Sequence, residues 1–147
     1  MSNGVPSYIV WKSEYSVGDA TLDAQHQEIF QVINTLYGRI RSGVTEQEFK
    51  QLVEKAKGYA AKHFRTEELA MQDCGFPELE NHKRAHRRYE ERVVRLTPTK
   101  PRYSDEESYE LLSFLIKWWK NHVIGLDQKY VPYLKYIDQP VKAVGED

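Results

Sequence analysis

Apolar residues recur at helical spacing in four separate stretches of the chain. In the first stretch the steps between successive positions alternate between four and three, so all of them fall on one face of a helix. Three further stretches repeat this spacing, at residues 49–74, 79–96 and 112–122. The pattern therefore predicts four amphipathic helices. The positions on the first face are Leu22, His26, Ile29, Ile33, Leu36 and Ile40.

Start and stop signals separate the predicted helices. Gly43 ends the first, because glycine readily adopts the backbone conformation that closes a helix. Thr45 and Glu48 then match a capping box, in which each side chain accepts a hydrogen bond from the backbone N–H of the other residue. Gly75 and Pro77 end the second helix and begin the third, in the order typical of these residues. These signals imply short connections between successive helices.

Short connections between four amphipathic helices favour an all-α fold, an up-down-up-down four-helix bundle. A proline-bearing loop at 97–104 ends the third helix, and a second capping box at 104–107 begins the fourth. We expect a single domain with three parts. These are an N-terminal arm at 1–18 packed on the outside, the bundle at about 19–130, and a C-terminal segment at 131–147 that contains a short helix.

Composition narrows the class of protein. A chain of 147 residues with 40% hydrophobic residues suits one globular domain. The net charge of -1 gives no electrostatic basis for binding nucleic acid or an anionic membrane. The one cysteine, Cys74, excludes an internal disulfide, a thiolate zinc site and an iron–sulfur cluster. No signal peptide and no apolar run of ~20 residues is visible, so we expect a cytoplasmic protein, and a monomer.

All five histidines fall on the inward faces of the predicted helices, together with Glu67. A single histidine on an apolar face is usually a hydrogen-bonded core residue. Burying several imidazoles and a carboxylate without partners, however, would cost roughly 1–3 kcal/mol for each polar group. A metal ion would give all of them a partner at once. The histidines are His26, His63, His82, His86 and His122.

The spacing of these residues supports a shared site. Residues four apart lie on one helix face, so His63 can point to the same place as Glu67. The same holds for His82 and His86, on the next predicted helix. The two pairs flank one turn signal, which brings them to neighbouring helices.

Asp127 is harder to place. It follows His122 by five residues, which an ideal helix puts about 140° apart around its axis. Either a wider, π-type turn brings the two side chains together, or Asp127 stays outside the site on the helix surface. Gly125 lies between them and makes a local distortion easier.

The sequence resembles the hemerythrins, in particular the bacterial single-domain type, over nearly the whole chain. The resemblance rests on Trp11, on SVGDATLDAQH before the first ligand, on HFRTE, on GFPELENHKRAH and on WWKNHVIGLD. It implies a four-helix bundle around two non-haem iron ions joined by an oxo or hydroxo bridge. The implied ligands are His82, His86 and His122 for one iron, His26 and His63 for the other, and the bridging carboxylates Glu67 and Asp127.

The resemblance also implies a function. Three imidazoles and three bridging oxygens give one iron six donors, whereas two imidazoles leave the other iron with five donors and one open position. An open position on a buried metal is where a small ligand enters. We therefore expect a non-enzyme that binds dioxygen reversibly, as an oxygen carrier, store or delivery protein. The alternatives are a sensor of oxygen or redox state, and a centre that handles peroxide or nitric oxide.

Other metal-dependent classes lack their motifs here. A ferritin-like di-iron oxidase needs Glu-x-x-His, but no histidine in this chain has a glutamate three positions before it. A zinc protease needs His-Glu-x-x-His, and HKRAH has lysine at the position of the glutamate. A His-Asp phosphohydrolase needs that doublet, and no histidine here is followed by aspartate.

Trp119 is the clearest departure from the family pattern. It precedes His122 by three residues on the same helix face, where relatives commonly carry leucine. Either the indole narrows the pocket that dioxygen enters, or it is simply a bulky core residue. If it narrows the pocket, it slows oxygen entry or autoxidation, and a Trp119→Leu substitution changes those rates.

Overall fold

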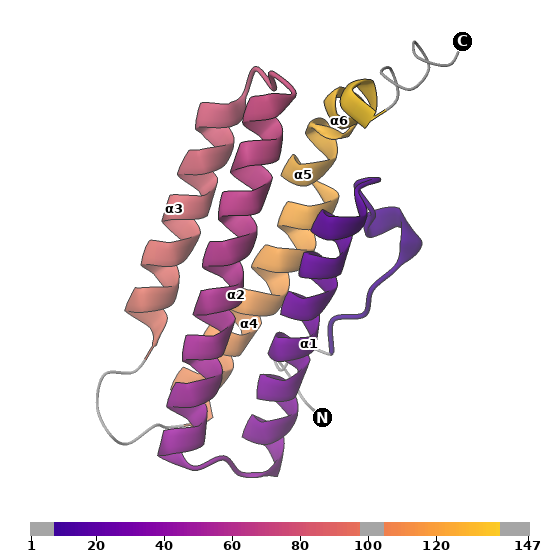
Figure 1. The fold of residues 1–147 in the computed structure, drawn as a ribbon. Coiled ribbons are helices and arrows are strands. Elements are labelled where there is room, and N and C mark those ends of the chain that lie inside the picture. Colours follow the sequence, from indigo (N-terminus) through magenta and orange to yellow (C-terminus); the bar gives the residue numbers. More distant parts are fainter. Residues whose placement is uncertain (1–7, 98–104, 139–147) are drawn as a thin grey trace.

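The computed structural model describes residues 8–97 and 105–138 and confirms the all-α bundle (Figure 1). Its elements are η1 (Ser13–Tyr15), α1 (Ala20–Ser42), α2 (Glu46–Asp73), α3 (Leu79–Leu96), α4 (Asp105–Ile124), α5 (Leu126–Lys129) and α6 (Val131–Asp138). The helices α1 to α4 run alternately up and down, and α1 and α3 both pack against α2 and α4. Within the described ranges, no helix combines the length and the apolar character needed to cross a membrane.

The predicted signals at Gly43, Thr45 and Gly75 lie at helix ends, whereas α3 begins at Leu79, two residues after the predicted start at Pro77. Thr45 accepts a hydrogen bond from the backbone N–H of Glu48, whose carboxylate accepts one from the backbone N–H of Thr45, both at 3.1 Å. Gly43 and Gly75 follow the ends of α1 and α2 with φ of +98° and +70°, a region that favours glycine. The second predicted capping box, at 104–107, begins outside the described residues.

The described part of the N-terminal arm, residues 8–18, makes specific hydrogen bonds to the bundle and buries side chains against it. The backbone N–H of Ile9 donates to the Asn34 side chain, and the Asn34 amide donates back to the Ile9 carbonyl, both at 2.9 Å. Ile9 and Tyr15 are buried in the main apolar core. Trp11 packs edge-on against Tyr15, with the ring centroids 5.6 Å apart. The arm thus runs along the outside of the helices and buries the Ile9 and Tyr15 side chains in the core (Figure 1).

Two apolar cores lie on either side of a layer of buried polar residues. Along α1, Leu22 belongs to the smaller core and Phe30 to the larger one, and His26 lies between them. Along α2, Glu67 occupies the equivalent place. A layer of buried polar residues thus crosses the helices of the bundle between the two apolar cores. The smaller core consists of Val17, Leu22, Met71, Phe76, Tyr130 and Leu134.

Candidate metal centre

The seven residues that the sequence analysis singled out as ligands meet in this polar layer. One comes from α1, two from α2, two from α3, one from α4 and one from α5. All seven side chains are buried, with exposed fractions from 0% to 6%. They form a three-histidine group and a two-histidine group, with two carboxylates between them. The three-histidine group is His82, His86 and His122, the two-histidine group is His26 and His63, and the carboxylates are Glu67 and Asp127.

Glu67 divides its two oxygens between the groups. Its Oε1 lies 2.9 Å from His86 Nε2 and 3.3 Å from His82 Nε2. Its Oε2 lies 3.6 Å from His63 Nε2 and 4.0 Å from His26 Nε2. One oxygen therefore faces the three-histidine group and the other faces the two-histidine group.

Asp127 divides its oxygens in the same way. Its Oδ1 lies 3.0 Å from His122 Nε2 and 3.1 Å from His82 Nε2. Its Oδ2 lies 3.1 Å from His26 Nε2. Both carboxylates therefore lie between the two groups of imidazoles.

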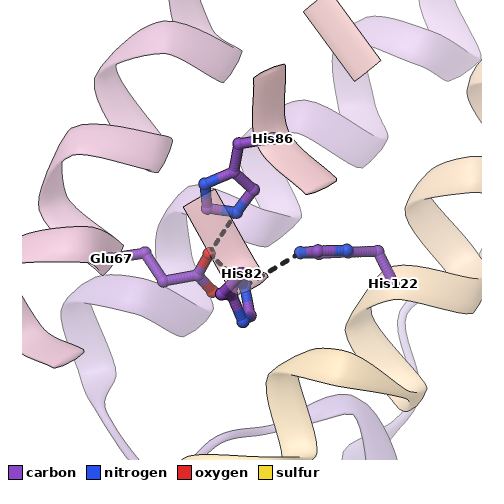
Figure 2. Close-up of side chains that lie close together, drawn as sticks. All are labelled: Glu67, His82, His86 and His122. Carbon is purple, nitrogen blue, oxygen red and sulfur yellow. Dashed lines mark hydrogen bonds and ion pairs between the residues drawn. The ribbon is translucent and has the colours of Figure 1, made fainter. Parts of the chain in front are cut away.

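The donor atoms gather into two sets of four. In the first set, Glu67 joins the three-histidine group, and Figure 2 shows these side chains pointing toward one another from α2, α3 and α4. In the second set, Glu67 and Asp127 join the two-histidine group. Within each set the ligand atoms lie within 4.8 Å of one another, which is close enough for one metal ion to contact all four.

A break in the last helix of the bundle resolves the position of Asp127. α4 ends at Ile124, and α5 begins at Leu126, so no π-type turn is needed to bring Asp127 beside His122. Gly125 adopts φ -109° and ψ -91° at the break. A Cβ atom at this residue would lie 2.8 Å from the backbone carbonyl oxygen of Asn121. The lack of a side chain at Gly125 therefore permits the break.

Several buried polar atoms of the cluster lack a hydrogen-bond partner within the described part of the chain. Although imidazole and carboxylate atoms lie close together, eight of them make no hydrogen bond. Each such group would cost roughly 1–3 kcal/mol if it stayed without a partner. A cation at each set of donors would satisfy the six of these atoms that face the cluster, so the residues fit a metal site; the Nδ1 atoms of His26 and His82 point away from it. The atoms are Nδ1 and Nε2 of His26, Nε2 of His63 and His86, Nδ1 of His82, Oε1 of Glu67, and both carboxylate oxygens of Asp127.

Burial and the neighbouring imidazoles shift the pKa values of the two carboxyl groups in opposite directions. Burial disfavours ionisation of Glu67, but the imidazoles, His63 first, outweigh it and hold the pKa of this carboxyl well below its usual range. Burial and the Glu67 charge raise the pKa of Asp127, yet contacts with His122 and its neighbours leave it below its usual range. Burial lowers the pKa of His82, but Asp127 and Glu67 raise it to about 9. A metal ion that binds here would therefore displace protons.

Two residues that the sequence analysis missed orient imidazoles of the cluster. Gln25 Oε1 lies 2.9 Å from His63 Nδ1, and the Gln25 amide donates to Thr66 Oγ1 at 3.2 Å. Glu68 Oε2 lies 2.7 Å from His86 Nδ1. A partner on Nδ1 fixes the ring and leaves Nε2 free to face a metal. Both contacts cross between helices, so the spacing along one helix carries no signal for them.

The sequence analysis also missed Tyr130, which contacts a carboxylate of the cluster directly. Its hydroxyl donates to Glu67 Oε2 at 2.5 Å, and its side chain is 0% exposed. Burial and the Glu67 charge raise the pKa of Tyr130 well above its usual range, so the phenol stays protonated and remains a donor. Tyr130 follows Asp127 by three residues, a spacing that could have pointed to the same level of the bundle.

Trp119 lies on the side of the two-histidine group and is 1% exposed. Its ring centroid is 5.9 Å from that of His63 and 6.4 Å from that of His26. The indole Nε1 donates a hydrogen bond to the Tyr89 hydroxyl at 2.9 Å, which fixes the plane of the ring. The Phe64 ring stacks on both Trp119 and His86. Trp119 is thus packed against the half of the cluster that has fewer imidazoles.

Comparison with known proteins gives one family throughout. A family model described as a hemerythrin HHE cation binding domain matches residues 17–134, a span that includes all seven clustered residues. A bacteriohemerythrin of Stenotrophomonas maltophilia is 28% identical over 127 residues, covering 86% of this chain and 82% of that protein. A bacteriohemerythrin of Clostridium acetobutylicum is 27% identical, covering 83% and 98%. A hemerythrin-like protein of Naegleria gruberi is 28% identical, covering 88% and 97%. The chain therefore belongs to the hemerythrin family.

Proposed function

We propose that this protein binds dioxygen reversibly at a centre of two iron ions in the polar layer. Imidazole and carboxylate donors without a thiolate suit iron, and the family model describes a cation-binding domain. The ligand roles follow the two sets of donors. One ion is held by His82, His86 and His122, the other by His26 and His63, and both by the bridging carboxylates Glu67 and Asp127.

The observation that carries the proposal is the division of the carboxylate oxygens. Glu67 turns Oε1 to the three-histidine group and Oε2 to the two-histidine group, at distances from 2.9 to 4.0 Å. Asp127 does the same with Oδ1 and Oδ2, at 3.0 and 3.1 Å. A centre with one ion would leave one oxygen of each carboxylate and one group of imidazoles without a partner. Two ions use all of them.

The residues of the chain prepare this site for a small ligand. When bound, the two irons would supply an open coordination position and the electrons for reversible dioxygen binding. The Tyr130 hydroxyl holds Glu67 in position on the side of the two-histidine group. Gln25 holds the His63 ring. The apolar side chains around that group exclude water, which protects a reduced centre from unwanted reactions.

We infer that Trp119 limits the space beside the two-histidine group. The proposal rests on its place against His26 and His63, and on the hydrogen bond to Tyr89 that fixes the indole. A large rigid ring at this position leaves less room for an incoming ligand than a leucine would. Trp119 therefore sets how fast dioxygen enters or how slowly the centre autoxidises.

Metal analysis together with optical spectra tests the proposed function. The reduced protein is measured without oxygen, then in air, and then after oxygen has been removed again. Two irons per chain and a visible band that appears with oxygen and disappears without it support the proposal. Irreversible bleaching, or rapid peroxide consumption without a stable oxygenated form, contradicts it and favours an oxidative enzyme.

A further inference from the structure

A groove between α3 and α4 lies beside the three-histidine group and is not used by the proposed oxygen chemistry. It is a hollow of about 580 Å³ that is open to solvent, and His122 forms part of its lining. Volumes of this size are typical of sites for small molecules. The groove therefore has room for a ligand that approaches the cluster from the surface without reaching the metal ligands of the two-histidine group.

Aromatic rings form the inner wall of the groove. The Trp118 ring stacks on His122, with centroids 4.2 Å apart and planes 13° apart. Tyr89 lies 4.3 Å from Trp118, and Phe114 stacks on Tyr89 at 5.7 Å. Trp118 and Phe114 are only partly buried and line the groove. His122 and Tyr89 cover the two faces of the Trp118 ring, so a ligand in the groove meets its edge. Such a wall suits a flat aromatic ligand, because aromatic rings also pack edge to face.

Arginines form the outer rim of the same groove. Arg88, Arg92 and Arg95 lie on successive turns of α3, and all three are exposed and line the groove. Glu91 is the only acidic residue among the described residues of the lining. The Arg92 guanidinium lies over the Phe114 ring, 5.2 Å from its centroid. The rim is therefore basic, although the whole chain has a net charge of -1.

We propose that this groove binds a planar aromatic ring that carries a phosphate, as in a flavin or purine mononucleotide. The ring packs against the edge of Trp118, and the phosphate binds the arginine rim. Guanidinium groups present a planar fork that matches phosphate, and their charge strengthens the hydrogen bonds. An acidic protein would meet the same charges, but it would not need a hollow with an aromatic wall. The inference is independent of oxygen binding.

Titration of FMN into the metal-loaded protein, followed by flavin fluorescence, tests this site. Contact with Trp118 quenches the flavin, so the expected result is saturable quenching with one FMN per chain. Riboflavin has the same ring without the phosphate and is expected to bind at least about tenfold more weakly. AMP and orthophosphate are then added as competitors. Displacement by AMP identifies the purine mononucleotide as a ligand, and failure of AMP to displace FMN identifies the flavin; both support the proposed chemistry.

Substitutions distinguish the contribution of the arginine rim to binding from that of the aromatic wall. Arg88→Gln and Arg92→Gln together are expected to weaken FMN binding at least about tenfold while leaving riboflavin unchanged. Trp118→Leu is expected to weaken both ligands. Arg84→Gln is the matched control, because Arg84 lies on the same helix, donates to Asn81 and does not line the groove. Helical content and melting temperature are compared for every variant.

Three results would overturn the proposal. The first is the absence of saturable binding for both FMN and AMP. The second is equal binding of FMN and riboflavin, which would remove the role of the phosphate. The third is displacement of FMN by orthophosphate at the same concentration as by AMP, which would leave an anion site with no preference for a ring.

Discussion

The two halves of the centre differ in their distance from solvent. In the two-histidine group, His26 and His63 are both 0% exposed, and the Trp119 ring packs against them. In the three-histidine group, His122 is 6% exposed and lines a surface groove. One imidazole of that group also contacts Glu68, whose side chain is 27% exposed. The half with fewer imidazoles is therefore the drier one.

This difference fits the roles that we propose for the two halves. A metal with three imidazoles and two carboxylates has its positions filled by the protein and bridge, so nearby solvent has no place to bind. A metal with two imidazoles keeps an open position, and a dry environment reserves it for a small apolar ligand. The fold thus places the Trp119 ring beside the half of the cluster that has fewer imidazoles.

The largest effect is expected for a residue that both halves share. Glu67→Gln keeps the shape of the side chain but removes the charge that both groups of imidazoles face. We expect the affinity for both ions to fall by more than about 100-fold, because Glu67 is a direct ligand of both in the proposed centre. Metal content after dialysis measures the loss. Glu54→Gln is the control, since Glu54 is exposed on the same helix and pairs with Lys57. Two ions retained in Glu67→Gln would contradict the shared role.

The next effect concerns the helix break that positions Asp127. In Gly125→Ala, the new Cβ would lie 2.8 Å from the carbonyl oxygen of Asn121, so the backbone must shift. We expect a loss of about 1–3 kcal/mol in the free energy of unfolding and weaker metal binding, measured by denaturant titration and metal content. Gly58→Ala in α2 meets nothing within 4 Å and is expected to stabilise the protein by about 0.5–1 kcal/mol. If the two variants change stability in the same direction, the break is not required.

A pair of substitutions distinguishes one half from the other. Gln25→Ala removes the partner of His63, and Glu68→Ala removes the partner of His86. Loss of such a partner typically weakens metal binding about 10- to 100-fold. We expect each variant to lose affinity for one ion and keep the other, as two separate steps in a metal titration. Equal weakening of both ions in both variants would show that the halves do not act separately.

The smallest effect is expected in ligand entry. Trp119→Leu opens space beside the two-histidine group, and we expect a change of several-fold in the rate of dioxygen association or autoxidation, measured by stopped flow. Tyr89→Phe removes the hydrogen bond that fixes the indole and should act in the same direction, but less. Val94→Ala, at an exposed position of α3, should leave the association rate unchanged. Identical rates in Trp119→Leu and the wild type would contradict a role of Trp119 in ligand entry or autoxidation.

The sequence predicted the features that depend on neighbours along one helix. The capping box of Thr45, the ends at Gly43 and Gly75 and the pair of His82 with His86 are all local, so spacing and residue type define them. The contact of Asp127 with the cluster could not be settled in this way. It depends on a break at Gly125, whose geometry follows from a close approach to another turn of the backbone.

Contacts between helices were beyond the sequence for a different reason. Gln25, Glu68 and Tyr130 each reach a side chain on another element, and the spacing of residues along one helix does not indicate such pairs. The same applies to the arm, where Ile9 is buried because its backbone pairs with the Asn34 side chain. Periodicity identifies which side chains point inward, and the packing of the helices decides which of them meet.

Anomalous scattering at the iron absorption edge, from crystals of the iron-loaded protein, tests the central claim most directly. We expect two iron peaks: one beside the three-histidine group, one beside the two-histidine group, with Glu67 and Asp127 between them. The second iron should have one position without a protein donor, facing Trp119. A single peak, or a second iron with all its positions filled by side chains, would contradict the account.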